Sequence, residues 1–274
     1  MALVTRAGGA DAISDRFMRH LAGLVLLAAL SLSACGSEEE QPTLLVSAAS
    51  SLTEAMTEIA GAFEAERGQV TVELNFGASS ALATQIVEGG APVDVFASAN
   101  AAQMQRLSDS GDVGESRAFA HNALVLVVPA SSSRDSFEAI AESGVRLVLA
   151  APDVPIGAYA REVIAAAGAS GQFESGFADA VLGNVVSEEA NVRQVLTKVE
   201  LGEADAGIVY ATDAIVSGDL VRTIPVPAEF APLAVYPIAT IAESPEPEVA
   251  RLFVDFVLSS EGQAILQRHG FTSP

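Results

Sequence analysis

TLLVSAASSLTEAMTEIAGAFEAERG, residues 43–68, predicts a buried strand that runs directly into a helix. The first seven residues are mostly apolar, as expected of a short strand that is covered on both faces. From Leu52 to Phe63 the apolar residues recur at helical spacing, and Gly68 is suited to end the helix. A strand followed closely by a helix is the repeating unit of α/β proteins.

The same alternation continues to the end of the chain. Further strands are predicted at 69–76, 92–99, 123–129, 145–152, 204–211 and 233–241, and helices at 79–90, 100–111, 136–144, 158–168, 190–202 and 247–270. Short strands that alternate with helices form βαβ units and parallel sheets. The pattern restarts after residue 122, and the tail after residue 237 is too short to form a domain of its own.

We therefore predict an α/β fold with two lobes that face a cleft. Each lobe is expected to be a mostly parallel sheet flanked by helices. Residues 43–120 together with 238–274 are assigned to lobe 1, and residues 121–237 to lobe 2. The hinges are expected near 120–123 and 235–238, where the chain would cross between the lobes.

The composition limits the kinds of partner. Half of the 274 residues are apolar, which is enough for a sizeable core, and the formal net charge is −21. A chain this acidic does not bind nucleic acid by neutralising phosphates. A site for an anion would have to work without an attractive overall field.

The first 34 residues have the organisation of a secretion signal. A basic region at 16–20 precedes the apolar stretch LAGLVLLAALSL (21–32), which is too short to span a bilayer. LSAC (32–35) then resembles the end of a bacterial lipoprotein signal. The resemblance implies that Cys35, the single cysteine, carries a lipid, and that 35–42 is a flexible tether. The body would be extracytoplasmic, in the periplasm or at the cell surface, and held to a membrane. The alternative is an ordinary secretory signal with an incidental cysteine.

Turns rich in small or hydroxyl residues follow several of the predicted strands. Helices are expected to open at Ser51, at Ser79, near 155–158 and near 191–192. Ser51 with Glu54 three residues later also fits an ordinary capping box. In parallel sheets such turns lie together at the carboxyl ends of the strands. Helix N-termini present unpaired N–H groups and partial positive charge, so several of them together make an anion site without arginine or lysine.

Six motifs resemble those of the periplasmic molybdate-binding proteins of ABC importers. They are VSAASSLTEAM, NFGASSALATQI, GAPVDVFASA, VPIGAYA, GIVYATDA and QRHGFT, in the order of that family, and the match covers nearly all of residues 43–274. The resemblance implies a type II-like periplasmic-binding-protein fold. It also implies a monomer without a cofactor that captures molybdate, and tungstate too, and delivers the ion to a permease driven by an ATPase subunit.

The resemblance further implies that three side-chain hydroxyls and two backbone N–H groups contact the ion. The residues are Ser51, Ser79, Tyr210, Ile156 and Val192. Ser80 is a candidate to assist Ser79, because FGASS (76–80) has fewer serines than relatives have there. The alternative for the serines is helix capping alone, and for Tyr210 it is packing with the hydroxyl on a backbone group. Arg193 is expected on the surface or in a pair between the lobes.

Other functions are less consistent with the sequence. A serine hydrolase would need a base beside its nucleophile, yet the chain has no G-x-S-x-G turn, and outside the signal its histidines are His121 and His269. Two scattered histidines do not make a metal site. We therefore expect a binding protein rather than an enzyme. Capture of another tetrahedral oxyanion, such as sulfate or phosphate, is the alternative within that class, and the choice would depend on cavity size.

Overall fold

The computed structural model describes residues 2–3 and 41–274, and residues 41–274 form a compact unit of their own. The predicted signal peptide, Cys35 and most of the tether lie outside the described residues. Within the described part of the chain, none of the helices combines the length and the apolar composition that a membrane span requires.

The first lobe is built on a five-stranded sheet with the order β2-β1-β3-β10-β4. β1 pairs in parallel with β2 and β3, whereas β10 lies antiparallel between β3 and β4. Four strands therefore run in one direction and one runs against them. The bounds are β1 Thr43–Ala49, β2 Thr71–Gly77, β3 Val95–Ala97, β4 Arg117–Asn122 and β10 Ala234–Thr240.

The second lobe repeats this arrangement in the order β7-β6-β8-β5-β9. β6 pairs in parallel with β7 and β8, and the opposed strand is β5, between β8 and β9. The bounds are β5 Leu124–Pro129, β6 Leu147–Ala150, β7 Val185–Glu189, β8 Ala206–Tyr210 and β9 Val221–Pro225.

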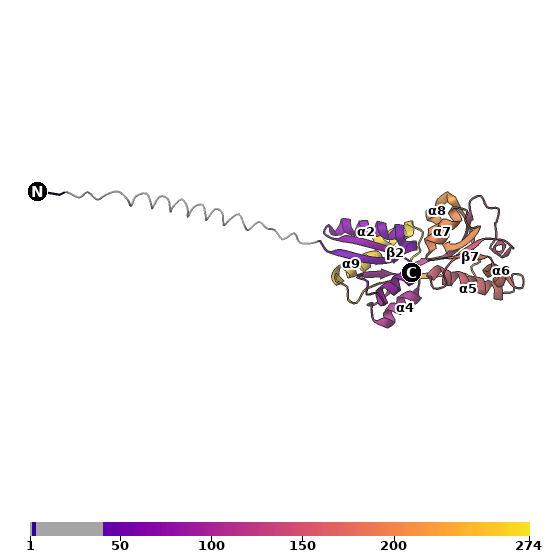
Figure 1. Cartoon of the computed structure of the whole chain (residues 1–274), viewed down its shortest axis with the longest axis horizontal. Coiled ribbons are helices and arrows are strands. Elements are labelled where there is room, and N and C mark those ends of the chain that lie inside the picture. The colour runs from indigo at the N-terminus through magenta and orange to yellow at the C-terminus, as the bar shows by residue number, and fades with distance from the viewer. Residues whose placement is uncertain (1, 4–40) are drawn as a thin grey trace. The chain divides into compact units, whose positions relative to one another are not determined.

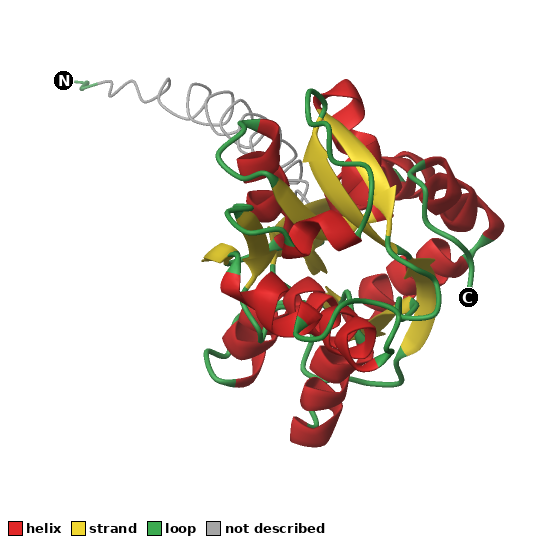
Figure 2. Ribbon diagram, turned by 90° about the vertical axis from the view of Figure 1, so that its right-hand side faces the viewer, coloured by secondary structure: helices red, strands yellow, loops and turns green. Residues whose placement is uncertain are grey.

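Helices flank the sheets of both lobes (Figure 2). In the first lobe they are α2 Thr53–Arg67, α3 Ser79–Val87, α4 Ala101–Ser110, α9 Pro247–Leu258 and α10 Ser260–Arg268; in the second they are α5 Pro155–Ala169, α6 Phe177–Gly183, α7 Val192–Glu200 and α8 Ala211–Ser217. Three 3₁₀ turns, η1 Ser50–Leu52, η2 Glu138–Ala141 and η3 Gly218–Leu220, complete the described elements.

The C-terminal helices return to the first lobe. Figure 1 shows α9 near α2, which comes from the beginning of the body. Phe63 of α2 meets Phe253 of α9 edge to face, with 5.2 Å between the ring centroids. The apolar side chains of these helices therefore share one core with the first sheet.

The chain passes twice between the sheets. β4 ends at Asn122 and β5 begins at Leu124, so the first crossover falls at the predicted hinge. The second lies between Pro225, the end of β9, and Ala234, the start of β10. The boundary expected after residue 237 falls inside β10, so the sheets assign 234–237 to the first lobe. The apolar pattern of β10 predicts a strand but does not say which sheet it joins.

The predicted fold class, two α/β lobes with mostly parallel sheets, is confirmed. The region 136–144, predicted as a helix, contains only the single turn η2, and 247–270 forms two helices that meet at Ser259. Three strands were not predicted, namely β4, β7 and β9. All three lie at the edges of their sheets.

Candidate functional site

The carboxyl ends of strands from both sheets meet at one cavity between the lobes. In the first lobe, β1 leads into η1 and β2 leads into α3; in the second, β6, β7 and β8 lead into α5, α7 and α8. The cavity has about 200 Å³ of space free of atoms, part of which is open to solvent. Its lining residues are Ala49, Ser50, Ser51, Gly77, Ala78, Ser79, Ala99, Val154, Pro155, Ile156, Val192 and Tyr210.

All five residues implied as ion contacts line this cavity. Each is at most 3% exposed, so the two lobes cover these residues. Ser80 is also buried, but it is not among the lining residues. Ser50, which was not predicted, lines the cavity next to Ser51.

The two serine hydroxyls each have one hydrogen bond to the protein already. The Ser79 Oγ accepts the N–H of Ala99 at 2.9 Å, and the Ser51 Oγ lies 2.9 Å from the Tyr236 hydroxyl. The Tyr210 hydroxyl is buried and makes no hydrogen bond of good geometry within residues 41–274, although the Tyr236 side chain lies beside it. A buried polar group without a partner is costly, and here it leaves a donor available at the cavity.

Two backbone N–H groups are available because of their positions in helices. Ile156 is the second residue of α5 and Val192 the first of α7, and the first four N–H groups of a helix have no acceptor within it. Asn191 caps α7 by accepting the N–H of Gln194 at 3.1 Å. That cap satisfies a different donor and leaves the Val192 N–H free to face a ligand.

Gly157 explains why α5 begins so close to the cavity. A Cβ at this position would lie 2.0 Å from the carbonyl oxygen of Ala151 and 2.5 Å from that of Ala150. Only a residue without a side chain lets the first turn of α5 pack directly on the end of β6.

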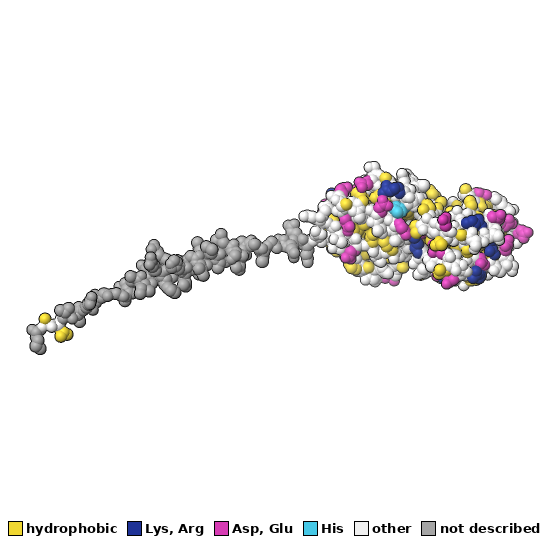
Figure 3. Space-filling view, turned by 90° about the horizontal axis from the view of Figure 1, so that it is seen from above, with side chains coloured by type: hydrophobic (Ala, Val, Ile, Leu, Met, Phe, Trp, Pro, Cys, Tyr) yellow, Lys and Arg dark blue, Asp and Glu magenta, His cyan; other side chains and the backbone are white. Residues whose placement is uncertain are grey.

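The cavity lining contains no charged side chain. Acidic side chains are scattered over the face of the body in Figure 3, with fewer basic ones among them. An anion here would be held by hydroxyls, amides and helix N-termini in a region that excludes water, where dipoles act strongly.

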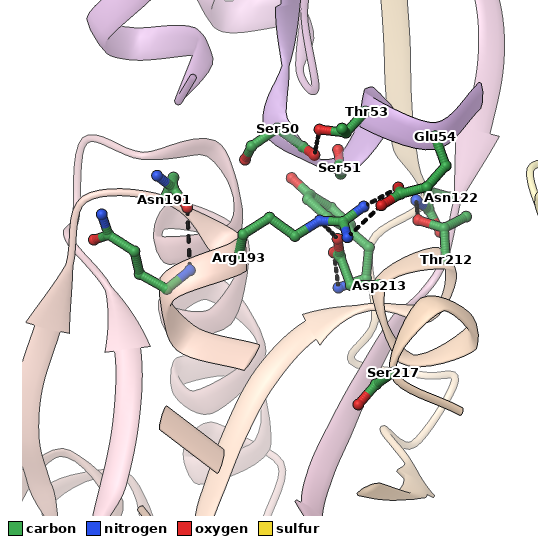
Figure 4. A network of polar contacts seen from close by, with 12 residues as sticks. Ser50, Ser51, Thr53, Glu54, Asn122, Asn191, Arg193, Thr212, Asp213 and Ser217 are labelled. Atoms are coloured by element: carbon green, nitrogen blue, oxygen red, sulfur yellow. Dashed lines mark hydrogen bonds and ion pairs between the residues drawn. The ribbon is translucent and has the colours of Figure 1, made fainter. Parts of the chain in front are cut away.

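The nearest charged groups form a cluster that joins the lobes. Arg193 of α7 reaches between Glu54 of α2 and Asp213 of α8 (Figure 4). Its Nη1 lies 3.0 Å from Glu54 Oε1, and its Nε lies 2.9 Å from Asp213 Oδ1. Of the two possibilities for Arg193, the pair between the lobes is confirmed. The capping box that was the alternative for Ser51 and Glu54 is not formed, because Glu54 binds Arg193 and the Ser51 hydroxyl lies next to that of Tyr236.

Burial shifts the titration of several groups in this region. It raises the pKa of Asp213 to about 7, against the opposing effects of Arg193 and of the Tyr210 N–H, which Asp213 accepts at 3.2 Å. Burial also raises the pKa of Tyr210 and of Tyr236 well above the usual value. Both tyrosines therefore stay protonated at physiological pH and remain hydrogen-bond donors.

Four polar residues near the cavity were not predicted: Asn122, Thr212, Asp213 and Tyr236. Asp213, two residues after the end of the strand predicted at 204–211, could have been found from its spacing, because an acid at the third position of a helix is a common cap. The others carry no local signal. His269 lies 2.7 Å from Glu58 on the surface, and no group of metal-ligating side chains occurs among residues 41–274.

Comparison with known proteins places these features in context. Residues 44–272 match the profile of the bacterial extracellular solute-binding proteins. The molybdate-binding protein ModA of Mycobacterium tuberculosis is 36% identical over 245 residues, which are 88% of this chain and 89% of that protein.

Two further proteins are similar over most of their length. A Bacillus subtilis protein, provisionally named ABC transporter substrate-binding lipoprotein YvgL, is 33% identical over 263 residues, 94% of this chain and 97% of its own. The substrate-binding domain of a provisionally named molybdenum ABC transporter from Clostridium difficile is 30% identical with a TM-score of 0.63. That match covers 85% of this chain and 99% of that domain.

Proposed function

Because the chain belongs to the family of bacterial extracellular solute-binding proteins, we propose that it captures molybdate outside the cytoplasm and delivers it to an ABC importer. The observation that carries the proposal is the closed cavity between the lobes, with neutral donors from both of them and no charged side chain in its lining. The relatives in this family are binding proteins, and the chain is not an enzyme.

The donors suit a doubly negative tetrahedral ion. The hydroxyls of Ser51, Ser79 and Tyr210 and the N–H groups of two helix N-termini would each meet an oxygen of the ion. A hydrogen bond to a charged group contributes about 1.5–3 kcal/mol net, so five of them supply on the order of 8–15 kcal/mol. Micromolar binding needs about 8 kcal/mol in addition to an association cost of roughly 4 kcal/mol or more, so the set reaches it without a cation in the lining only towards the upper end of that range.

Binding and closure would be coupled. Ser51 and Ser79 belong to the first lobe, and Ile156, Val192 and Tyr210 to the second. An ion that contacts both groups favours the closed form by the difference between its affinities for the closed and open forms. The closed form is then the one presented to the permease and its ATPase subunit.

Size would set the choice among oxyanions. Sulfate and molybdate share charge and tetrahedral shape, so a pocket spaced for the larger ion leaves sulfate with longer, weaker hydrogen bonds. Tungstate would be accepted with molybdate. A binding protein for sulfate or phosphate is the alternative function.

Calorimetry on residues 41–274 with molybdate, tungstate, sulfate and phosphate tests the proposal, since this unit contains both lobes. We expect heat of binding with molybdate and tungstate and much weaker binding of the other two ions. Preference for sulfate or phosphate would support the alternative. No binding of any of the four would reject the function.

We also propose that the protein is a monomer anchored to the outer side of a membrane through a lipid on Cys35. The signal pattern before this cysteine and the lipoprotein in the name of the Bacillus subtilis relative support the anchor. Cys35→Ser should move the protein from the membrane fraction to the soluble fraction of cells that express the full chain. Unchanged partitioning of the variant would reject the anchor.

A further inference from the structure

We propose that Tyr236, held by Asn122 at the first crossover between the lobes, fixes the Ser51 hydroxyl as a hydrogen-bond donor to the bound ion. Tyr236 would be a positioning residue, because it acts through Ser51 and does not line the cavity. The inference rests on the proposed function and adds a residue to the selection of the ligand.

Tyr236 is held rigidly beside Ser51. It lies in β10, where the pairing with β4 is irregular between Tyr236 and Pro237, and such bulges re-aim side chains. Its side chain is fully buried, and its ring packs edge to face on Phe119, Tyr210 and Phe271 with centroids 5.5–6.4 Å apart. The hydroxyl at the end of this ring is 2.9 Å from Ser51 Oγ.

Asn122 determines the direction of the hydrogen bonds. Its Oδ1 accepts the N–H of Ala123 at 3.0 Å, so its Nδ2 must face the other way. Nδ2 can only donate, and it lies 2.8 Å from Thr212 Oγ1 and 3.4 Å from the Tyr236 hydroxyl. With its oxygen accepting from Asn122, Tyr236 would direct its own proton to Ser51 Oγ, the nearer of these two partners.

A serine hydroxyl that already accepts a hydrogen bond uses its single proton elsewhere. For Ser51, the remaining direction is the cavity that it lines. Without Tyr236 the hydroxyl could rotate and accept from another donor, and the contact with an anion would be lost for part of the time. Ser79 is oriented in the same sense, because its Oγ accepts the Ala99 N–H.

The hydrogen bonds that run from Ser51 through Tyr236 and Asn122 to Thr212 form a hydroxyl chain that also reaches the second lobe. Thr212, the last member, lies in α8, and Asn122 is the last residue of β4, just before the crossover (Figure 4). Thr212, Asn122, Tyr236 and Ser51 are each at most 3% exposed. Water therefore does not compete for these hydrogen bonds while the lobes are closed.

A double-mutant cycle separates positioning from packing. Wild type, Ser51→Ala, Tyr236→Phe and the double variant are titrated with molybdate, tungstate, sulfate and phosphate, and the cycle uses whichever ion binds wild type most tightly. We expect Tyr236→Phe to weaken binding roughly tenfold and Ser51→Ala roughly tenfold to a hundredfold. The double variant should bind within about twofold of Ser51→Ala, because Tyr236 acts only through that hydroxyl.

Two results would overturn the inference. One is wild-type affinity in Tyr236→Phe; the other is a further tenfold loss when Tyr236→Phe is added to Ser51→Ala, which would indicate a role in packing. Ser110→Ala removes a hydroxyl at the end of α4, outside the cavity lining and the hydroxyl chain, and it should change affinity little. Thermal melting of each variant shows whether it is folded.

Because the cycle uses whichever ion binds wild type most tightly, its result does not depend on molybdate being the natural ligand. If wild type prefers sulfate, the proposed ligand is wrong, but the cycle still reports on Tyr236. If wild type binds none of the ions, both the function and the positioning role are rejected.

Discussion

The hydroxyl groups that line the cavity differ in whether they already have a hydrogen-bond partner in the protein. The Ser79 hydroxyl accepts the Ala99 N–H and the Ser51 hydroxyl shares a hydrogen bond with Tyr236, whereas the Tyr210 hydroxyl is buried and makes no hydrogen bond of good geometry in the described part of the chain. The serines are thus satisfied before a ligand arrives, but Tyr210 is not. An unsatisfied buried hydroxyl lowers the stability of the closed form. That stability is recovered when a ligand accepts a hydrogen bond from the hydroxyl.

Tyr210→Phe should therefore have opposite effects on stability and affinity. We expect the ligand-free protein to melt at the same temperature as wild type or higher, because the unpaired hydroxyl is gone. Molybdate binding should weaken by about 1–3 kcal/mol through the lost donor. Calorimetry and thermal melting check the two parts. Unchanged affinity would remove Tyr210 from the proposed contacts.

The motifs in the sequence supplied five of the residues that line the cavity but none of the polar residues behind them. Ser51 and Tyr210 stand in recurring strand-to-helix motifs, which can be recognised locally. Tyr236 meets Ser51 across 185 residues of sequence, and the contact depends on a bulge in β10 and on the register of a whole sheet. Asn122 likewise acts through its place at a crossover.

At the scale of elements, the start of α5 depends on a close approach to β6. The substitution Gly157→Ala places a Cβ 2.0 Å from a backbone oxygen, so the helix start must move. We expect lower thermal stability and a loss of molybdate affinity of at least tenfold, because the Ile156 N–H moves with it.

Gly61→Ala is the matched control. Gly61 lies within α2, and nothing lies within 4 Å of a Cβ built on it. Alanine should stabilise that helix by about 1 kcal/mol and leave affinity unchanged. If Gly157→Ala behaves like this control, α5 does not need the close approach.

Asp213, in the first turn of α8, should make stability depend on pH. Its pKa rises from 3.8 to about 7 on folding, so between these values the folded state binds more protons than the unfolded state. Stability from this group is therefore fully present below about pH 4 and is lost as the pH rises towards 7, by up to about 4 kcal/mol.

Urea unfolding of wild type and Asp213→Asn across pH 4–8 isolates this contribution. The asparagine retains an oxygen that can accept the Tyr210 N–H, but it does not titrate. We expect the stability of the variant relative to wild type to increase as the pH rises from 4 to 7. A constant difference over that range would show that Asp213 does not change its protonation there.

The strands that the sequence did not predict share a physical property. β4, β7 and β9 are edge strands, and they lack the continuous apolar runs of strands covered on both faces. VVSEE in β7 and RAFAHN in β4 carry polar residues that an edge tolerates. The central strands β1, β5, β6 and β8 are covered on both faces, so they require continuous apolar runs. Those runs are visible in the sequence, and the strands were therefore predicted.

At the scale of the whole molecule, the two lobes were predicted, but their exact division was not. The alternation of strands and helices indicates α/β lobes. The sheet that β10 joins, however, depends on pairing between strands far apart in the sequence. β10 crosses back at Ala234 and brings Tyr236 into the first lobe beside Ser51. The position of this crossover thus matters for the site as well as for the domain boundary.

Closure of the lobes should depend on Arg193, which joins Glu54 of one lobe to Asp213 of the other. Its two partners are not equivalent. The Asp213 side chain is fully buried, whereas that of Glu54 is 35% exposed. Removing Glu54 leaves Arg193 paired with Asp213, but removing Arg193 leaves a buried acid without a cation.

Glu54→Gln should therefore weaken molybdate binding only about twofold to fivefold, as expected of a partly exposed pair. Arg193→Gln should destabilise the protein by on the order of 3 kcal/mol and weaken binding more. Small-angle scattering should show a more open ligand-free form for both. Glu248→Gln breaks an exposed pair within α9 and serves as the control. If both cluster variants match it in affinity and in radius of gyration, the ion alone holds the lobes together and the Arg193 cluster has no part in closure.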